Sequence, residues 1–198
     1  TDQYDLAIVD PPYGMVESGM QMGGHVKGKK FNRTELNKWD IRPSKEYFVE
    51  LLRVSKNQII WGGNFFCNNL PISRAWLCWD KIGGDNLTCV NNELAWTSFT
   101  CALKMFRRHQ GKDKGFMLKK QVDKKIHPTQ KPVALYTWIL NNYAKEGDKI
   151  LDTHLGSGSI AIACHDMGYS LDGYELDTEY YEGGKHKNRH KWVISFPT

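Results

Sequence analysis

The chain has 198 residues, which suits a single domain of ordinary size, and its 40% hydrophobic content with seven Trp residues allows a substantial core. No apolar run reaches the length of about 18 residues that a membrane span needs. The five cysteines form no Cys-x-x-Cys pair, so we expect no zinc site and predict reduced, buried cysteines in a cytoplasmic protein.

The formal net charge of +5 is unevenly distributed, because basic residues gather at 27–33 and again at 104–125. Nucleic acid would attract both segments, although a solvated loop face explains each of them equally well when it is taken alone. The candidate contacts to nucleic acid are Lys27, Lys29, Lys30, Arg107, Arg108 and Lys112.

Residues 5–9 predict a short buried strand, and four unusual residues follow it directly: Asp10, Pro11, Pro12 and Tyr13. The two prolines lack backbone N–H groups and fix their own φ angles, so the chain after the strand is stiff. An acidic side chain, an unpaired carbonyl and an aromatic ring are therefore held together where strands of open α/β sheets meet their ligands. A proline-rich turn without function is the simpler alternative.

The middle of the chain predicts a helix between two loops, followed by several strands. Residues 14–40 are rich in glycine and basic side chains and predict a long mobile loop. Ser44 is a plausible N-cap for a helix over 44–55. Apolar runs punctuated by Gly, Asn and Pro predict strands at 58–63, 75–81, 93–99 and 102–108, and the region 104–126 is the second basic loop. We expect Trp61, Trp76, Trp79 and Trp96 to lie in the core.

The last third predicts a helix, a strand, a glycine turn, a second helix and a strand. The first helix lies within 127–148, with Thr129 or Gln130 at its cap, Pro132 in its first turn and Gly147 just past its end. The second helix covers about 159–167 and ends at Gly168. The basic tail beyond 178 predicts a further short helix.

The glycine turn fits the pattern G-x-G-x-x-A, with Gly156 and Gly158 between a strand and a helix. Glu175 follows at the end of the next strand, where an acid binds ribose hydroxyl groups, so we expect a cofactor that contains a nucleoside. Asp152 ends the strand before the turn and would repel a pyrophosphate, but it suits an amino group or a sulfonium. This chemistry favours S-adenosylmethionine over a dinucleotide.

Three motifs in a fixed order now resemble one known family. Asp10–Tyr13 comes first, His127-Pro-Thr-Gln-Lys131-Pro comes next, and Asp152–Ser159 with Gly-Tyr-Glu175 comes last. This order resembles that of the S-adenosylmethionine-dependent DNA amino-methyltransferases of the permuted β group. The resemblance spans nearly the whole chain and implies a single α/β domain over 1–198 with the class I methyltransferase fold. We expect a mostly parallel, seven-stranded sheet with helices on both faces and the catalytic strand first.

The resemblance also implies roles for individual residues. Asp10 and the Pro11 carbonyl would accept hydrogen bonds from the exocyclic amine of a flipped-out base, and Tyr13 would stack on that base. Pro12 completes the catalytic set. The residues expected at the cofactor are Asp10, His127, Lys131, Asp152, His154, Gly156, Ser157, Gly158 and Glu175.

Asp in the first position of the catalytic motif implies N6 of adenine as the target, with N4 of cytosine as the alternative. The chain has no Pro-Cys dipeptide, which argues against methylation at C5 of cytosine, because that reaction needs a cysteine nucleophile. The expected partners are DNA and a second copy of the chain, without a metal or a membrane, in a bacterial or phage-infected cell.

One departure from the family pattern concerns the glycine motif, where Thr153-His154 stands in place of Pro-Phe. We expect the His154 ring to stack near the cofactor as the Phe does. The departure leaves open a non-catalytic module that binds DNA or S-adenosylmethionine, and a dinucleotide-dependent oxidoreductase is a more distant alternative.

Overall fold

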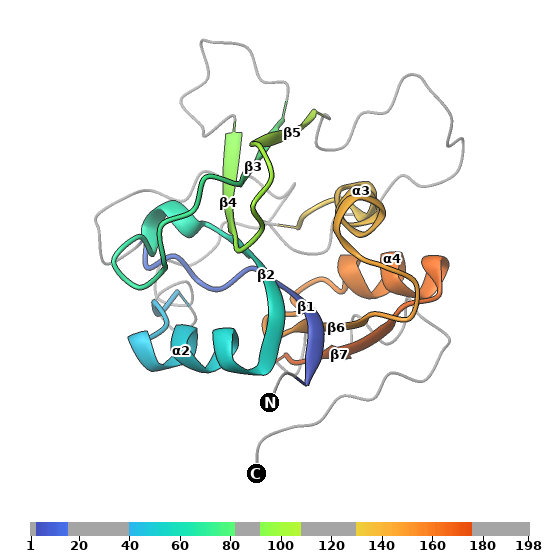
Figure 1. The fold of residues 1–198 in the computed structure, drawn as a ribbon, viewed down its shortest axis with the longest axis horizontal. Helices are drawn as coiled ribbons and strands as arrows, with labels where there is room; N and C mark the ends of the chain where they lie inside the picture. The colour runs from blue at the N-terminus through green and yellow to red at the C-terminus, as the bar shows by residue number, and fades with distance from the viewer. Residues whose placement is uncertain (1–2, 16–39, 82–91, 108–129, 176–198) are drawn as a thin grey trace, which may run out of the picture.

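The structure is a computed structural model that describes residues 3–15, 40–81, 92–107 and 130–175 (Figure 1). These ranges contain, in chain order, β1 (Tyr4–Val9), α2 (Lys45–Val54), β2 (Ser55–Trp61), the 3₁₀ turn η1 (Gly63–Phe65), β3 (Trp76–Asp80), β4 (Asn92–Thr97), β5 (Lys104–Arg107), α3 (Val133–Tyr143), β6 (Lys149–Asp152), α4 (Ser159–Met167) and β7 (Ser170–Gly173).

The seven strands form one sheet in the order β5-β3-β4-β2-β1-β6-β7. Neighbouring strands are parallel except at β4, which runs antiparallel to both β2 and β3. The predicted mostly parallel, seven-stranded sheet is confirmed. Because β4 is reversed, its first residues lie at the edge where the parallel strands end, and Asn92 pairs with Asp80 at the end of β3.

Strand β1 lies between β2 and β6, so the chain builds the sheet outward from β1 in two directions. The carboxyl ends of β1 and β6 therefore meet at the switch point, where open α/β sheets bind their ligands. Asp10 directly follows β1 and Asp152 is the last residue of β6. The topology thus brings together two carboxylates that are far apart in sequence.

Helices cover both faces of the sheet, as expected, and successive residues of β1 pack into different cores (Figure 1). Leu6 and Ile8 pack with α3 and α4, whereas Ala7 and Val9 pack with Phe48 of α2. A strand in the middle of such a sheet is buried on both sides, which explains its continuous apolar sequence.

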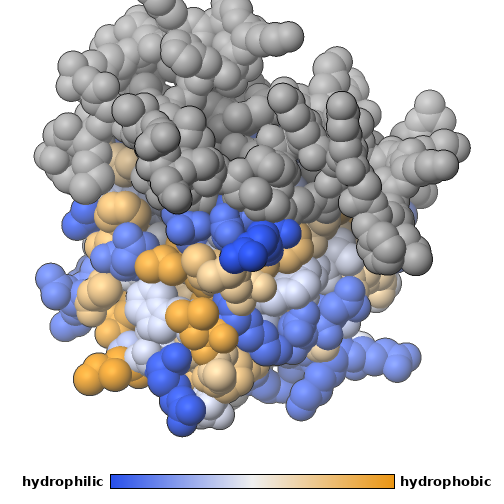
Figure 2. Space-filling view, turned by 90° about the horizontal axis from the view of Figure 1, so that it is seen from above, coloured by the Kyte–Doolittle hydropathy of each residue, from blue (hydrophilic) through white to orange (hydrophobic). Residues whose placement is uncertain are grey.

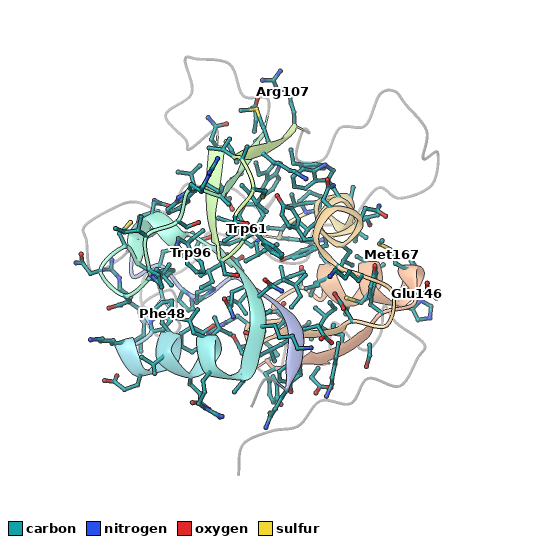
Figure 3. The ribbon with its side chains drawn as sticks, viewed as in Figure 1. Phe48, Trp61, Trp96, Arg107, Glu146 and Met167 are labelled. Atoms are coloured by element: carbon teal, nitrogen blue, oxygen red, sulfur yellow. The ribbon has the colours of Figure 1, made fainter. Side chains whose placement is uncertain are left out.

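The prediction that four tryptophans lie in the core is confirmed. Trp61, Trp79 and Trp96 are buried and Trp76 is half-buried, and Figure 3 shows Trp61 and Trp96 within the interior. Ring centroids of Trp61 and Trp79 lie 6.5 Å apart in an edge-to-face arrangement. These two rings belong to the same core as the buried residues of α3.

The predicted α2 and α4 are confirmed, with Ser44 at the N-cap of the first and Gly168 at the C-cap of the second. Strand β2 begins at Ser55, directly after α2 and earlier than predicted. Ser55 adopts an extended conformation and its hydroxyl donates to the Leu51 carbonyl at 2.6 Å, so the helix ends without a loop.

The predicted boundaries of α3 are wrong at both ends. The helix begins at Val133, and Pro132 is its N-cap in an extended conformation. The proline also disfavours a helical conformation for Lys131, the residue before it, so the helix does not begin there. It ends at Tyr143 with Ala144 as the C-cap, so Gly147 belongs instead to the turn that precedes β6. Most of the predicted mobile loop and second basic loop, and the whole predicted tail helix, lie outside the described residues.

Four cysteines fall within the described ranges, and all four are free thiols. Cys78 and Cys164 are buried as expected, whereas Cys67 is exposed because it follows the η1 turn at the surface, and Cys101 is half-buried. Within the same ranges, no helix is both long and apolar enough to cross a membrane.

Gly62, just after β2, lies against the Tyr13 ring, so a substitution there tests whether β2 supports the residues after β1. Its φ is +68°, and an added Cβ would lie 2.2 Å from Cε1 of Tyr13. Gly147 has a similar φ of +83° but nothing within 4 Å of the same position. We expect Gly147→Ala to cost about 1 kcal/mol through backbone strain, and Gly62→Ala to cost about 2–4 kcal/mol because it also displaces the Tyr13 ring.

Urea unfolding of the two variants measures this difference in the free energy of unfolding. Equal losses would mean that Tyr13 moves aside at no cost and that its position does not depend on Gly62.

Candidate active site

The segment after β1 is held at its far end by two side chains that precede α2. The Gly14 N–H donates to Asp40 Oδ1 at 3.0 Å, and Asp40 is buried. Arg42 donates to the Tyr13 carbonyl from Nε at 3.2 Å and from Nη2 at 3.1 Å. These bonds, together with the fixed φ angles of the two prolines, hold the Asp10–Tyr13 segment at the end of β1.

Both oxygens of the Asp10 carboxylate have partners. Oδ1 accepts a hydrogen bond from the Tyr13 hydroxyl at 2.7 Å, and Oδ2 lies 2.5 Å from Lys131 Nζ. The Lys131 side chain is only 3% exposed, so this ion pair is largely removed from water. A buried ammonium is costly unless negative charge surrounds it.

A second carboxylate meets the Lys131 ammonium. Glu93 Oε2 lies 3.1 Å from Lys131 Nζ, and the other Glu93 oxygen pairs with Lys81. The four side chains therefore alternate in sign along the carboxyl edge of the sheet, and we call Lys81, Glu93, Lys131 and Asp10 the charge chain. None of its links joins residues that are neighbours in sequence.

The surrounding charges and burial fix the protonation of Lys131, Glu93 and Tyr13. Burial alone lowers the pKa of Lys131, but the Asp10 and Glu93 carboxylates more than offset this and hold that pKa above its usual value. Burial raises the pKa of Glu93, yet Lys131 and Lys81 bring it below its usual value. Burial, reinforced by the Asp10 charge, raises the pKa of Tyr13, so its hydroxyl keeps the proton that it donates.

An aromatic group supports the Tyr13 ring. Phe65 stacks on it with centroids 5.0 Å apart and ring planes 16° apart, and Phe66 meets it edge-on at 6.2 Å. Lys131 Nζ lies 5.2 Å from the centroid of the Trp61 ring, within the range of a cation–π contact. The half-buried Tyr13 is thus fixed through its hydroxyl and through one ring face.

The glycine turn after β6 is folded against the end of β7. Leu155 N–H donates to the Tyr174 carbonyl and Tyr174 N–H donates to the Asp152 carbonyl, each at 2.8 Å. Gly156 and Gly158 have φ angles of +53° and +70°, which glycine adopts readily. Glu175 Oε2 accepts a hydrogen bond from Gly156 N–H at 2.6 Å, so the expected ribose-binding acid lies directly beside the turn.

Asp152 is 1% exposed and accepts a hydrogen bond from the backbone N–H of His154 at 2.9 Å. Burial raises the pKa of Asp152 to about 8, and the neighbouring Asp10 and Glu175 carboxylates contribute to the rise. The Lys131 charge opposes this rise but does not cancel it. The site is therefore suited to a ligand that brings a cation to Asp152.

The unusual Thr153-His154 pair is tied to α2 by hydrogen bonds. The Tyr47 hydroxyl lies 2.7 Å from Thr153 Oγ1, which in turn lies 2.9 Å from His154 Nδ1. The Tyr47 and His154 rings meet edge-on with centroids 5.5 Å apart. Burial lowers the pKa of His154 to about 4, so at neutral pH the position holds an uncharged aromatic ring, as it would with Phe.

The structure brings together the expected residues at the ends of β1, β6 and β7, and it places Lys131 against Asp10. Ser157 is buried, and its hydroxyl lies 3.1 Å from that of Ser159. Glu93, Lys81, Phe65 and Tyr47 were missed by the sequence analysis. Glu93 begins a predicted strand, which is the only signal that the sequence offered for it.

Most of the expected contacts to nucleic acid stay predictions. Lys27, Lys29, Lys30, Arg108, Lys112 and the expected cofactor residue His127 lie outside the described residues. Arg107 is described: it lies at the periphery on β5, exposed, and pairs with Asp80 at 2.8 Å (Figure 3). In Figure 2 the described surface intersperses hydrophilic and hydrophobic side chains. The described side chains contain no group of three or more potential metal ligands.

Comparison with known proteins gives a consistent result. A family model for N6 and N4 methyltransferases, described as DNA methylase, matches residues 27–186. The Type II methyltransferase M.HpaI of Haemophilus parainfluenzae is 38% identical over 65 residues, which are 33% of this chain and 21% of that protein. The Type II methyltransferase M2.DpnII of Streptococcus pneumoniae is 41% identical over 54 residues, 27% of this chain and 20% of that protein. The matches thus span about a fifth of the length of these curated relatives.

Solved structures resemble the fold over nearly the whole chain. The M1.HpyAVI–SAM complex superposes with a TM-score of 0.59 at 20% identity, covering 94% of this chain and 90% of the other. The cytosine-N4-specific PvuII DNA methyltransferase gives 0.56 at 12% identity, covering 92% and 78%. The modification methylase TTHA0409 of Thermus thermophilus, described as putative and solved with S-adenosyl-L-methionine, gives 0.53 at 14%, covering 93% and 86%.

Asp152 predicts an unusual dependence of stability on pH. Its pKa is raised on folding, from 3.8 to about 8, so the folded state binds the proton more tightly and stability declines as pH rises through this window. Asp152→Asn removes the titration and keeps an acceptor for the His154 N–H. We expect the variant to gain on the order of 2 kcal/mol over the wild type at pH 8, and little at pH about 4.

Thermal and urea unfolding across that pH range measure the effect, with Asp166→Asn, which alters an exposed residue of α4, as the matched control. A constant difference between Asp152→Asn and wild type at every pH would contradict the assignment.

Proposed function

The chain belongs to the DNA methylase family, and on that premise we propose that it transfers a methyl group from S-adenosylmethionine to the exocyclic amine of a base in DNA. The observation that carries the proposal is the position of Asp10–Tyr13 at the end of β1, beside the buried Asp152 at the end of β6. The Asp10 carboxylate, which pairs with Lys131, and the buried Asp152 carboxylate then serve different ligands, the base and the cofactor.

The residues around the glycine turn fit this cofactor. When bound, S-adenosylmethionine supplies a methyl group on a positively charged sulfur. Asp152 suits the cationic parts of the molecule, and Glu175 offers carboxylate oxygens to its ribose hydroxyl groups. The turn formed by Gly156, Ser157 and Gly158 would hold the cofactor, and the uncharged His154 ring would pack against it. His127 and Lys131 complete the proposed set on the strength of the family resemblance.

Asp10 and the Pro11 carbonyl act on the amine. The lone pair of an exocyclic amine is conjugated with the base, so the nitrogen is a weak nucleophile. Two acceptors that bind its two hydrogens favour a pyramidal, more reactive nitrogen. These groups are held in place before the base arrives, so the contribution is one of positioning and electrostatics.

Tyr13 supports the base. Phe65 covers one face of its ring, and its hydroxyl is held by Asp10, so the ring is fixed before binding. The proposed role of Tyr13 is to stack the other face on the flipped-out base, while the half-buried Pro12 keeps the segment rigid. Stacking offsets part of the cost of removing the base from the duplex.

N6 of adenine is the proposed target, because Asp in the first position of the motif resembles the adenine enzymes of the family. N4 of cytosine presents the same two hydrogens to Asp10 and Pro11, so it is the alternative within the same mechanism.

The test of the function is methyl transfer from labelled S-adenosylmethionine to mixed genomic DNA, followed by digestion and mass spectrometry of the nucleosides. N6-methyladenine supports the proposal, and N4-methylcytosine keeps the mechanism but changes the base. Cofactor binding without any methylated base overturns the proposal in favour of a non-catalytic module. RNA of mixed sequence serves as the control substrate.

Asp10 is expected to be required for transfer, whereas any contact that it makes with the cofactor should contribute little to cofactor affinity. Asp10→Ala removes an acceptor of the amine, so we expect the single-turnover rate to fall at least about 10²–10³-fold. Calorimetry should find cofactor affinity largely intact. Asp5→Ala, which alters an ion pair with Lys56 near the opposite end of β1, is the control. Retained turnover in Asp10→Ala would remove Asp10 from the mechanism.

Cofactor binding is expected to release a proton. Asp152 is largely protonated below pH about 8 in the free protein, and a cation beside it favours the carboxylate. Affinity should therefore rise with pH toward 8 and then level off. Calorimetry near pH 7, in two buffers of different ionisation enthalpy, should show release of close to one proton. Asp152→Asn should bind more weakly and release none; the same release from this variant contradicts the role of Asp152.

A further inference from the structure

Glu93 lies at the edge of the sheet where the site is built, yet the proposed reaction does not use it. The reversal of β4 brings it there: Glu93 is the second residue of β4, and it pairs in register with Trp79 near the end of β3. A parallel strand would have placed its first residues at the opposite edge. The side chain therefore reaches Lys131 across the end of β2.

The contacts of Glu93 are made through charge. Its Oε2 is buried without a hydrogen bond in the described part of the chain, and it lies 3.1 Å from Lys131 Nζ. The Lys131 cation is thus what offsets the removal of this oxygen from water. Lys81 pairs with the other oxygen and holds the carboxylate from the far side.

The Lys131 ammonium has its place because two carboxylates attract it from different directions. Besides Asp10 and Glu93, the Tyr13 hydroxyl lies 3.5 Å from Nζ, and the Trp61 ring lies within cation–π distance. Among the described residues, further ionisable groups that act on this region include Tyr136 from α3, Asp152 from β6 and His154 just after β6. Without the Glu93 charge, Asp10 is the remaining carboxylate in contact with Lys131, and its Oδ2 already lies 2.5 Å from Nζ.

We infer that Glu93 is a positioning residue for the reaction: through Lys131 it fixes the orientation of the Asp10 carboxylate toward the target amine. The inference rests on the proposed function. Glu93 itself is assigned no contact with substrate or cofactor. With Glu93 present, the Lys131 charge is shared between two carboxylates; without it, the cation competes fully with the amine for Asp10.

A double-mutant cycle tests this. Glu93→Gln keeps the shape of the side chain and removes its charge, and we expect the single-turnover rate to fall about 10- to 100-fold with the cofactor dissociation constant unchanged. Lys131→Met removes the link, and because Lys131 also belongs to the proposed cofactor set, all rates of the cycle are compared at saturating cofactor. If Glu93 acts through Lys131, adding Glu93→Gln to Lys131→Met should cause little further loss. Glu93→Asp, which keeps the charge, should recover part of the rate, and Glu50→Gln on exposed α2 is the matched control.

A readout independent of activity accompanies the cycle. NMR titration of the Lys131 side chain should show its pKa falling by about one unit or more in Glu93→Gln, since one of two neighbouring carboxylates is lost. Additive losses in the cycle, or a Glu93→Gln defect confined to cofactor affinity, overturn the inference. If the wild-type protein methylates no DNA but the Lys131 pKa still falls in Glu93→Gln, the proposed function fails while the ion pair between Glu93 and Lys131 stands.

Discussion

The buried ammonium of Lys131 is the constraint around which the site is arranged. A cation that is 3% exposed needs negative charge close by, and Asp10, just after β1, and Glu93, in β4, provide it. Breaking such a pair by removing one partner costs far more than the pair contributes, because a buried charge is left uncompensated. The end of β1, the start of β4 and the segment before α3 are therefore held in one arrangement by a single nitrogen.

Two carboxylates at the same edge of the sheet have opposite surroundings. Asp10 has a cation and a hydroxyl donor, whereas Asp152 is buried beside other carboxylates and has its pKa raised to about 8. Pairs of acids whose environments differ in this way commonly divide the work of a site. The proposed mechanism places the reacting amine at one and the cofactor at the other, and the electrostatics of this chain agree with that division.

Much of the architecture could be predicted from the sequence, because it rests on local signals. Apolar runs marked the strands, and Ser44 marked the start of α2. The Asp10–Tyr13 segment and the glycine turn were both located by residues that restrict or free the backbone. The start of α3 was misplaced because Pro132 was assigned to the helix, although a proline also keeps the residue before it extended.

The charge chain could not be predicted, because its links join residues that only the sheet topology brings together. The direction of β4 decides whether Glu93 lies at the site, and a short buried strand looks the same in sequence whichever way it runs. Nothing in the sequence indicates that Lys131 faces Asp10, since a lysine in this motif fits a ligand carboxylate as well as a protein one. Hence the sequence predicted the residues that are proposed to contact the ligands. It did not predict the side chains that hold those residues in position.

The hydrogen bonds from Tyr47 through Thr153 to His154 have an evolutionary consequence. Changing His154 alone to the usual Phe would leave the Thr153 hydroxyl without the ring nitrogen that it bonds, and changing Thr153 alone to Pro would strand both Tyr47 and His154. Each of these single changes breaks at least one hydrogen bond of the half-buried group without replacing it. The three residues are therefore expected to change together rather than one at a time.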